Sequence, residues 1–480
     1  MGRRQVELVF VATPGIGNLV PAVEFAQLLA NHDPRFHATI LALTDPHRPI
    51  ATTYIRSRPS SCGAGNLRFV HLPPPDPPRP GDYQSAMAHT CLNIANHAPL
   101  VKRALVDLRS TGARVAALFL DMFTTPMADV AGELGIPHYL FFASPASFLG
   151  FMLYLLDPEA RKAVESEDMS IELPVPSFVN SVPKRVLPSS VLLGKDALTW
   201  YVAHAGRYGQ TKGTVINTFE ELEGHALRSL RASMSPPVYS VGPVIDLDGP
   251  VKWHPQRAEQ EAIVQWLDKQ PLASVVFLCF GSMGSLSTPQ TKEIANGLEQ
   301  AGFRFLWSLR EPPRDKLDLP SDYVNVDQAL PEGFLDRTAE TGLVCGWVPQ
   351  VTILAHKAIG GFVSHCGWNS ILESLWYGVA MATWPIYSEQ QMNALQLVAE
   401  LGLALEIRLD YREGSALVTA EELARALRRL MDSKSELRSK VREMRDKSRM
   451  AMTEQGSSHA SMRHLVQELL AVLDFDDQES

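Results

Sequence analysis

One segment, Trp347–Gln390, gathers side chains that could hold a nucleotide and a sugar. The indole of Trp347 offers an aromatic face and the amide of Gln350 offers hydrogen bonds, and both suit a pyrimidine base. The carboxylate of Glu373 suits the hydroxyls of a ribose. So many suitable groups at fixed spacing are more specific than a single glycine-rich fingerprint.

A second set of polar side chains in this segment could bind a diphosphate. His365, Asn369 and Ser370 lie where an expected strand ends and an expected helix begins. Helix N-termini present free backbone N–H groups and the positive end of the helix dipole. The growing negative charge on a departing diphosphate would be stabilised there, with His365 as a further hydrogen-bond donor.

This segment resembles the signature of the plant-type UDP-dependent glycosyltransferases of family 1, and the likeness runs from Val6 to about Leu473. It implies an α/β GT-B fold, with two facing Rossmann-like domains and a cleft between them. It also implies an inverting transfer of sugar from UDP to a small acceptor. The UDP contacts implied are Ser282, Trp347, Val348, Gln350, His365, Gly367, Asn369, Ser370 and Glu373. The sugar contacts implied are Trp368, Glu389 and Gln390.

The resemblance also bears on the donor sugar. At the end of the segment, Gln390 resembles the residue found in glucose-using members of the family, whereas galactose-using members tend to carry histidine at that position. Trp368 argues against glucuronate, since users of that sugar tend to carry arginine. Glu389 replaces the more usual aspartate and keeps the carboxylate. The implied donor is UDP-glucose, while Ser282 as a plain helix N-cap remains the alternative to a phosphate contact.

The glycine-rich turn at 14–21, PGIGNLVP, follows the first expected strand. It lacks the third glycine of a dinucleotide fingerprint, because Val20 stands there. In the resembled family this loop reads G-H-x-x-P, and its histidine is the general base for the acceptor hydroxyl. Here that position is Asn18, whose amide has no useful basicity near neutral pH. Asp121 matches the carboxylate that orients this histidine in the family.

Several accounts of Asn18 stay open. The residue could be an engineered substitution, the acceptor could ionise with little help, or Asp121 could act directly or through a water. An inert Asn18–Asp121 hydrogen bond is the plainest alternative. In that case the chain could be a catalytically impaired UDP-sugar-binding protein, and a C-glycosyltransferase acting on ionised phenolic rings is a further alternative.

The acceptor site is the least legible part of the sequence. Apolar lining would suit a flat phenolic or terpenoid plant metabolite. The same residues could equally belong to the core. The candidates are Met122, Phe123, Phe142, Ser144, Phe148 and the segment His89–Ile94.

The elements that must position these groups follow from the alternation of short apolar runs and helical spacing, which predicts parallel sheets covered by helices. Strands are expected at 6–12, 37–43, 67–71, 115–120 and 138–142, and again at 275–279, 303–309, 343–346, 361–364 and 381–383. Helical spacing covers 20–31, 86–109, 127–134, 289–301, 419–453 and 457–473.

The length of 480 residues exceeds what one core usually holds, so two domains are expected. The prediction is an acceptor domain at 1–242, a linker at 243–252, a UDP-sugar domain at 253–455 and a helix at 456–480 that packs back on the first domain. The net charge of −9 argues against nucleic acid. A monomer that binds UDP-glucose and a small acceptor is expected.

The five cysteines are scattered without a CxxC pair, so neither a zinc site nor a disulfide framework is expected. Asp246-Leu247-Asp248 spells a possible Mg²⁺ motif, but its place in the expected linker favours a solvated turn, and no metal or other cofactor is predicted. Glu7 and Pro14-Gly15 interrupt the first apolar run, which favours a buried strand over a secretory leader. No run reaches the length of a membrane span, and a cytoplasmic protein is predicted.

Overall fold

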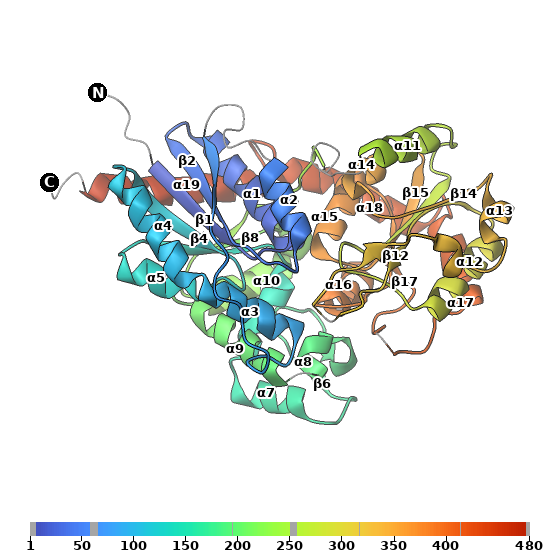
Figure 1. The fold of residues 1–480 in the computed structure, drawn as a ribbon, viewed down its shortest axis with the longest axis horizontal. Helices are drawn as coiled ribbons and strands as arrows, with labels where there is room; N and C mark the ends of the chain where they lie inside the picture. The colour runs from blue at the N-terminus through green and yellow to red at the C-terminus, as the bar shows by residue number, and fades with distance from the viewer. Residues whose placement is uncertain are drawn as a thin grey trace.

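This computed structural model has two parallel sheets, one in each half of the molecule and each covered by helices (Figure 1). The structure describes residues 6–57, 66–193, 195–249, 257–315, 317–412 and 414–476. Cys62 and the predicted linker residues 250–252 lie outside these ranges. The extent of the linker therefore stays a prediction.

The first half forms a seven-stranded sheet within the described residues. Its strands are all parallel, and the nearly continuous burial of the central strands β1 and β4 matches strands covered on both faces. In spatial order they are β3 (Leu67–His71), β2 (Phe36–Ala42), β1 (Val6–Ala12), β4 (Arg114–Leu120), β5 (His138–Phe142), β8 (Thr214–Ile216) and β9 (Val238–Ser240).

The second half forms a six-stranded parallel sheet in the described part of the chain. Its spatial order is β14 (Gly342–Cys345), β11 (Arg304–Ser308), β10 (Val275–Cys279), β15 (Ile359–Ser364), β16 (Met381–Thr383) and β17 (Ala404–Glu406). Two short antiparallel pairs add β6 (Glu172–Leu173) with β7 (Val182–Pro183), and β12 (Arg310–Glu311) with β13 (Ser321–Asp322).

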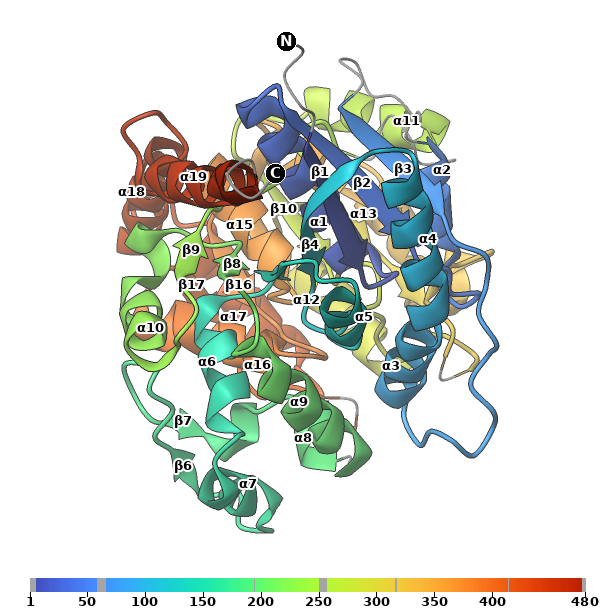
Figure 2. The same cartoon turned by 90° about the vertical axis from the view of Figure 1, so that its left-hand side faces the viewer.

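Helices fill the connections, and Figure 2 shows the first sheet with its covering helices from the side. Those of the first half are α1 (Ile16–His32), α2 (Pro49–Ser57), α3 (Ala86–Asn96), α4 (Ala98–Ser110), α5 (Met127–Glu133), α6 (Ala146–Tyr154), α7 (Pro158–Glu165), α8 (Ser189–Leu193), α9 (Lys195–Tyr208) and α10 (Glu220–Ser233). Those that follow are α11 (Arg257–Asp268), α12 (Thr288–Ala301), α13 (Phe334–Thr338), α14 (Gln350–Leu354), α15 (Trp368–Tyr377), α16 (Gln390–Leu395), α17 (Ala420–Leu430), α18 (Glu436–Ala451) and α19 (Ser457–Asp476).

The last helix, α19, packs against the first sheet rather than the second. Its apolar residues Met462, Leu465 and Leu469 share a buried cluster with Val6 of the first strand. Glu468 accepts hydrogen bonds from the hydroxyls of two tyrosines of that sheet, including Tyr139 at 2.9 Å. The chain thus crosses back to its first half, as the resemblance implies.

Two predicted helices are each divided in the structure. The helical spacing at 86–109 breaks at His97, because this buried ring bonds to the Asn93 carbonyl and the Thr44 amide, and Pro99 begins a new first turn. The spacing at 419–453 divides into α17 and α18. In the described residues, no helix has both the length and the apolar character that crossing a bilayer requires.

Candidate functional site

A cavity of about 500 Å³ lies between the two halves. It opens where the strands of both sheets end, which is where open α/β sheets bind ligands. Most of the residues predicted from the sequence line it: Asn18, Met122, Phe123, Ser144, Ser282, Trp347, Val348, Gln350, His365, Gly367, Trp368, Asn369, Ser370, Glu373, Glu389 and Gln390.

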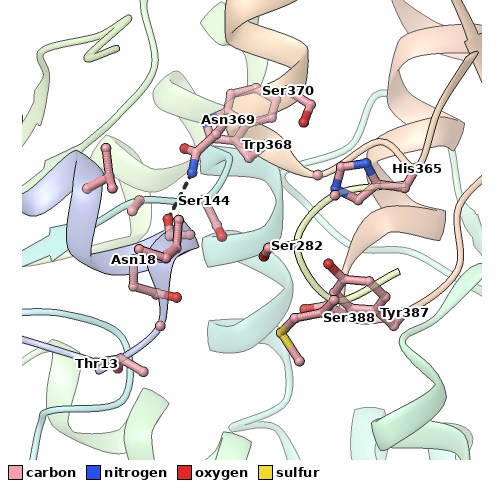
Figure 3. A pocket seen from close by; sticks show the side chains of 18 of the residues that line it. Thr13, Asn18, Ser144, Ser282, His365, Trp368, Asn369, Ser370, Tyr387 and Ser388 are labelled. Atoms are coloured by element: carbon pink, nitrogen blue, oxygen red, sulfur yellow. Dashed lines mark hydrogen bonds between the residues drawn. The ribbon is translucent and has the colours of Figure 1, made fainter. Parts of the chain in front are cut away.

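Ser282 and His365 meet because their strands are neighbours. β10 pairs with β15 at Cys279 and Ser364, so the loops after both strands leave the sheet side by side. Two glycines make room for the imidazole: a Cβ at Gly281 or at Gly367 would lie 2.5 Å from His365 Nε2. Figure 3 shows His365 facing the cavity opposite Asn18, with Ser282 between them.

The imidazole of His365 is buried, and burial lowers its pKa to about 4, with the Cys279 carbonyl opposing this shift. His365 is therefore neutral near pH 7 and offers one N–H donor. Cys366 follows with a left-handed φ of 64°, a conformation that is rare outside glycine and collects at functional sites. That strained bend carries the chain from β15 into α15.

The first turn of α15 lies at the cavity wall. Gly367 precedes the helix, so no side chain caps its free backbone N–H groups. Asn369 Nδ2 donates to the Gly17 carbonyl at 2.9 Å, and Trp368 Nε1 donates to the Asn217 carbonyl at 2.7 Å. Both bonds cross to the first half, so this helix end is held against the opposite wall (Figure 3).

A polar network marks the end of the cavity near Trp347. Gln350 Nε2 donates to Glu373 Oε2 at 2.6 Å and to Ser370 Oγ at 2.8 Å. Burial raises the pKa of Glu373 to about 7, the charge of Asp246 adds to this, and the Gln350 bond opposes it. The amide of Gln350, the hydroxyl of Ser370 and the carboxyl of Glu373 therefore line the cavity together with the indole of Trp347.

Asp246 corrects one prediction from the sequence. The solvated turn expected at Asp246-Leu247-Asp248 holds for Leu247, which is 51% exposed, but Asp246 is 9% exposed and lines the cavity. Its Oδ1 accepts from the Gly249 amide at 3.0 Å. The turn folds the carboxylate inward beside Glu373, and the local sequence carries no signal for this burial. Among the described residues, no group of three or more His, Cys, Asp and Glu side chains could hold a metal ion.

The predicted sugar contacts stand at the start of α16. Gln390 Oε1 accepts from the backbone N–H groups of Ile386 and Tyr387, each at 3.0 Å. Glu389 is 9% exposed, and its Oε1 accepts from Ser144 Oγ of the first half at 3.1 Å. Tyr387 and Ser388 also line the cavity and were missed, although they lie within the signature segment.

Asn18 and Asp121 are not joined. Asn18 lies in the first turn of α1 and lines the cavity, whereas Asp121 is 2% exposed and lies behind its wall. Among the hydrogen bonds of the described residues, none links these two side chains. Asp121 instead accepts from Thr13 N and Oγ1 at 2.5 and 2.9 Å, and from the amides of Phe123 and Thr124 at 2.9 and 3.0 Å. Burial raises the pKa of Asp121, and these four bonds oppose that shift.

The apolar end of the cavity includes Met122, Phe123 and Ser144, which were predicted to line it. Phe142 and Phe148 were also predicted to line the acceptor site, but they do not line the cavity. Both lie in the core, at 0% and 1% exposure, and their rings pack against Tyr208 and Tyr201. An apolar run gives no sign of which residues face a cavity. Thr90 and Cys91 of the candidate segment 89–94 line this end as well. Residues that also line it and were missed are Arg48, Met87, Ser190 and Tyr201.

Comparison with known proteins identifies the family. Residues 187–444 match the family described as UDP-glucoronosyl and UDP-glucosyl transferase. UDP-glycosyltransferase 43 of Pueraria montana var. lobata is 54% identical over 96% of this chain and 99% of its own length. UDP-glucose flavonoid 3-O-glucosyltransferase 6 of Fragaria ananassa is 44% identical over 97% of this chain and 100% of its own length.

A solved structure matches the whole fold. Medicago truncatula UGT71G1, crystallised with UDP-glucose, superposes with a TM-score of 0.89 at 41% identity, covering 97% of this chain and 98% of that chain. Sequence identity at this level over nearly the full length shows that this chain shares both the fold and the enzyme class of these proteins. This chain is therefore a GT-B glycosyltransferase and belongs to the UDP-glycosyltransferases of family 1.

Proposed function

We propose that this chain transfers glucose from UDP-glucose to a flat phenolic acceptor, with inversion at the anomeric carbon. The observation that carries the proposal is the continuity of the cavity. One end has an indole and a polar network, the other is apolar, and His365 and the N-terminus of α15 line the same cavity. The names of the relatives, a UDP-glucose complex and a flavonoid 3-O-glucosyltransferase, support this donor and acceptor class.

In this proposal the second half holds the donor. Uracil stacks on Trp347, and Gln350 and the Val348 backbone complete the recognition of the base. The ribose hydroxyls bond to Glu373. The diphosphate faces Ser282, Gly367 and the free N–H groups before Asn369 and Ser370, while Trp368, Glu389 and Gln390 meet the sugar. Those N–H groups and the His365 donor stabilise the charge that grows on UDP as the glycosidic bond breaks, and this part of the reaction needs no metal in the proposal.

The acceptor hydroxyl would attack from the side of Asn18. Asn18 can orient this hydroxyl but cannot take its proton. Asp121 is a poor substitute, because it is buried behind the wall and its oxygens already accept four hydrogen bonds. These contacts favour an acceptor that ionises readily, such as an electron-poor phenol.

The test is a mass-spectrometric screen of phenols and terpenoids of graded acidity with UDP-glucose, using this chain and its Asn18→His variant side by side. We expect glucosides from the most acidic phenols with Asn18, and a broader range with histidine. If neither form makes a product although both bind UDP, the proposal is wrong.

A second candidate is a catalytically impaired UDP-sugar-binding protein, which the absence of a base at Asn18 favours. UDP binding without turnover of UDP-glucose by any phenol would support it. Transfer to an electron-rich ring carbon is a third outcome of the same screen, recognised by a product that resists acid hydrolysis.

A further inference from the structure

Two helices from opposite halves of the chain begin at the sugar end of the cavity. α6 starts at Ala146, two residues after Ser144, and α16 starts directly after Glu389. Ser144 and Glu389 both line the cavity, and Ser144 Oγ donates to Glu389 Oε1 at 3.1 Å, which joins the two halves. The geometry of this end therefore depends on how the two helices are held. Figure 2 shows α6, α10 and α16 near one another.

The two helices are joined again behind the wall. Ser147 Oγ, in the first turn of α6, bonds to Gln396 Oε1 at 3.0 Å, and the two residues are 1% and 4% exposed. Gln396 follows α16 directly and opens a π-helical segment, Gln396–Glu400. Such widened turns are rare and are frequently found at functional sites.

A third element, α10, supplies a buried carboxylate to the same point. Glu223 Oε2 accepts from the Ala146 amide at 2.8 Å, and its Oε1 accepts from the Ser147 amide at 3.0 Å and from Gln396 Nε2 at 3.2 Å. The Glu223 carboxylate caps free N–H groups at the start of α6, and the positive end of the α6 dipole stabilises its negative charge. Glu223 is 2% exposed, and the backbone there leaves helical geometry, at φ −121° and ψ 34°.

We propose that Glu223, Ser147 and Gln396 form a staple that fixes α16 against α6 and thereby positions the sugar against the acceptor. The three residues do not line the cavity, so they act on the reaction through Ser144 on one side and Glu389 on the other. They are positioning residues. This inference rests on the proposed function, because it names what holds the sugar contacts of that same site in place.

The staple and the nucleotide contacts are on different elements. The effect of the staple on sugar positioning can therefore be measured separately from a general loss of protein stability. Trp347, Gln350 and Glu373 lie on or before α14 and α15, whereas the staple holds α16. A displaced α16 would misplace the glucose while the uridine and phosphate contacts stay in place. Loss of the staple should therefore change sugar recognition and transfer much more than UDP affinity.

The sharpest variant is Gln396→Glu, which sets a second buried carboxylate against Glu223. When both are ionised they repel each other, and at lower pH the pair shares one proton and keeps a hydrogen bond. The other charged groups near this point are Glu400 and Glu389 on the second half and His225 on α10. Glu400 accepts from the Val179 and Asn180 amides at 2.8 and 3.0 Å, and His225 lies 3.1 Å from the Pro176 carbonyl.

We expect Gln396→Glu to lower kcat/KM for glucose transfer by about 10–100-fold at pH 8, and to come within about threefold of the wild type near pH 5.5. The UDP affinity, measured by calorimetry, should stay within about threefold of the wild-type value at both pH values. Glu223→Gln combined with Gln396→Glu leaves one carboxylate in the pair, and it should recover much of the loss at pH 8.

The matched control is Gln290→Glu. Gln290 is fully buried in the second half, and its amide bonds to both the N–H and the carbonyl of Val418 at 2.9 Å, away from the staple. The same chemical change there should lower the Tm without a pH-dependent change in the ratio of transfer to UDP affinity. If Gln396→Glu behaves like this control, or loses UDP affinity in parallel with transfer, the staple has no positioning role.

A failure of the proposed function can be told apart from a failure of the staple. If the wild type transfers no glucose, the readout becomes the calorimetric affinity for UDP-glucose relative to that for UDP. The staple predicts that Gln396→Glu weakens UDP-glucose binding by about 10-fold at pH 8 while UDP binding is kept. Equal changes for both ligands would overturn the staple, whatever the reaction proves to be.

Discussion

The two walls of the cavity are built on different principles. The wall from the second half presents polar groups fixed by hydrogen bonds, such as the Gln350–Glu373–Ser370 network and the free start of α15. The wall from the first half is mostly apolar around Met122 and Phe123. A fixed polar wall suits one constant ligand, whereas an apolar wall gains binding from shape and can accept varied molecules. In the proposed function, UDP binds the polar wall and the acceptor binds the apolar wall.

The largest effect should come from the acceptor side. We expect Asn18→His to raise kcat/KM for weakly acidic phenols by about 10²–10⁴-fold, because in the proposed function the imidazole would act as a general base, which an amide cannot do. The gain should shrink as the phenol becomes more acidic. Rates across a phenol series with both forms would check this, and no gain for any phenol would mean that position 18 is not where the proton leaves.

On the donor side, His365→Ala should lower kcat by about 10²–10³-fold, since a hydrogen-bond donor to the departing diphosphate is lost. Transfer kinetics at saturating UDP-glucose measure this. The loss should be similar for every acceptor, whereas the effect of Asn18→His depends on the acceptor. A loss of kcat that varies with phenol acidity would indicate that His365 acts on the acceptor and not on the departing diphosphate.

A buried aromatic residue of the first half, Phe148, should affect stability rather than binding or catalysis. Phe148→Ala should cost about 3–5 kcal/mol in the free energy of unfolding, because the ring is enclosed in the core. Chemical denaturation measures it. UDP affinity of the folded fraction should be unchanged, and a selective loss of acceptor binding with full stability would restore Phe148 to the pocket.

Trp347→Ala should weaken UDP binding by about 1–3 kcal/mol through the lost stacking on uracil. Calorimetry with UDP gives the value, and the denaturation midpoint of the empty protein should change little compared with Phe148→Ala. Unchanged affinity would remove the indole from the nucleotide site.

The last expected effect concerns the pH dependence of stability. Because the pKa of Glu373 is raised to about 7, the folded empty protein keeps a proton that the unfolded chain releases above its ordinary value of 4.5. The unfolded state then binds fewer protons, so stability falls as pH rises from 4.5 through 7. Glu373→Gln should remove up to about 3 kcal/mol of this cost at pH 8 and little at pH 4.5. Thermal unfolding at both pH values tests it. The control is Glu443→Gln, which should give no gain at pH 8 because this exposed carboxylate is ion-paired with Lys447 and its pKa is lowered rather than raised. A gain for Glu373→Gln that is equal at both pH values contradicts the shift.

The sequence predicted the polar wall much better than the apolar one, for a physical reason. Buried parallel strands are continuous apolar runs, so the bounds of Val6–Ala12 and Met381–Thr383 agree with the structure. The polar groups that follow such strands must then meet at one edge of the sheet. An apolar side chain carries no comparable signal, because Phe142 in the core and Phe123 in the cavity look alike in sequence.

What escaped prediction depends on contacts between distant segments. The break at His97 arises from its bonds to Thr44 and Asn93, and the burial of Asp246 arises from a turn that folds against the second half. The separation of Asn18 from Asp121 belongs with these, since only the fold shows that Thr13 takes the carboxylate. Local pattern contains none of these pairings.

Proton NMR of UDP-glucose mixed with this chain and an electron-poor phenol tests the proposed transfer as a whole. It observes the donor, the product and the new anomeric centre in one sample. The account predicts that UDP and a β-glucoside of the phenol appear in equal amounts as UDP-glucose disappears. Persistence of UDP-glucose with every phenol, in the Asn18→His form as well, or formation of an α-glucoside, would contradict it.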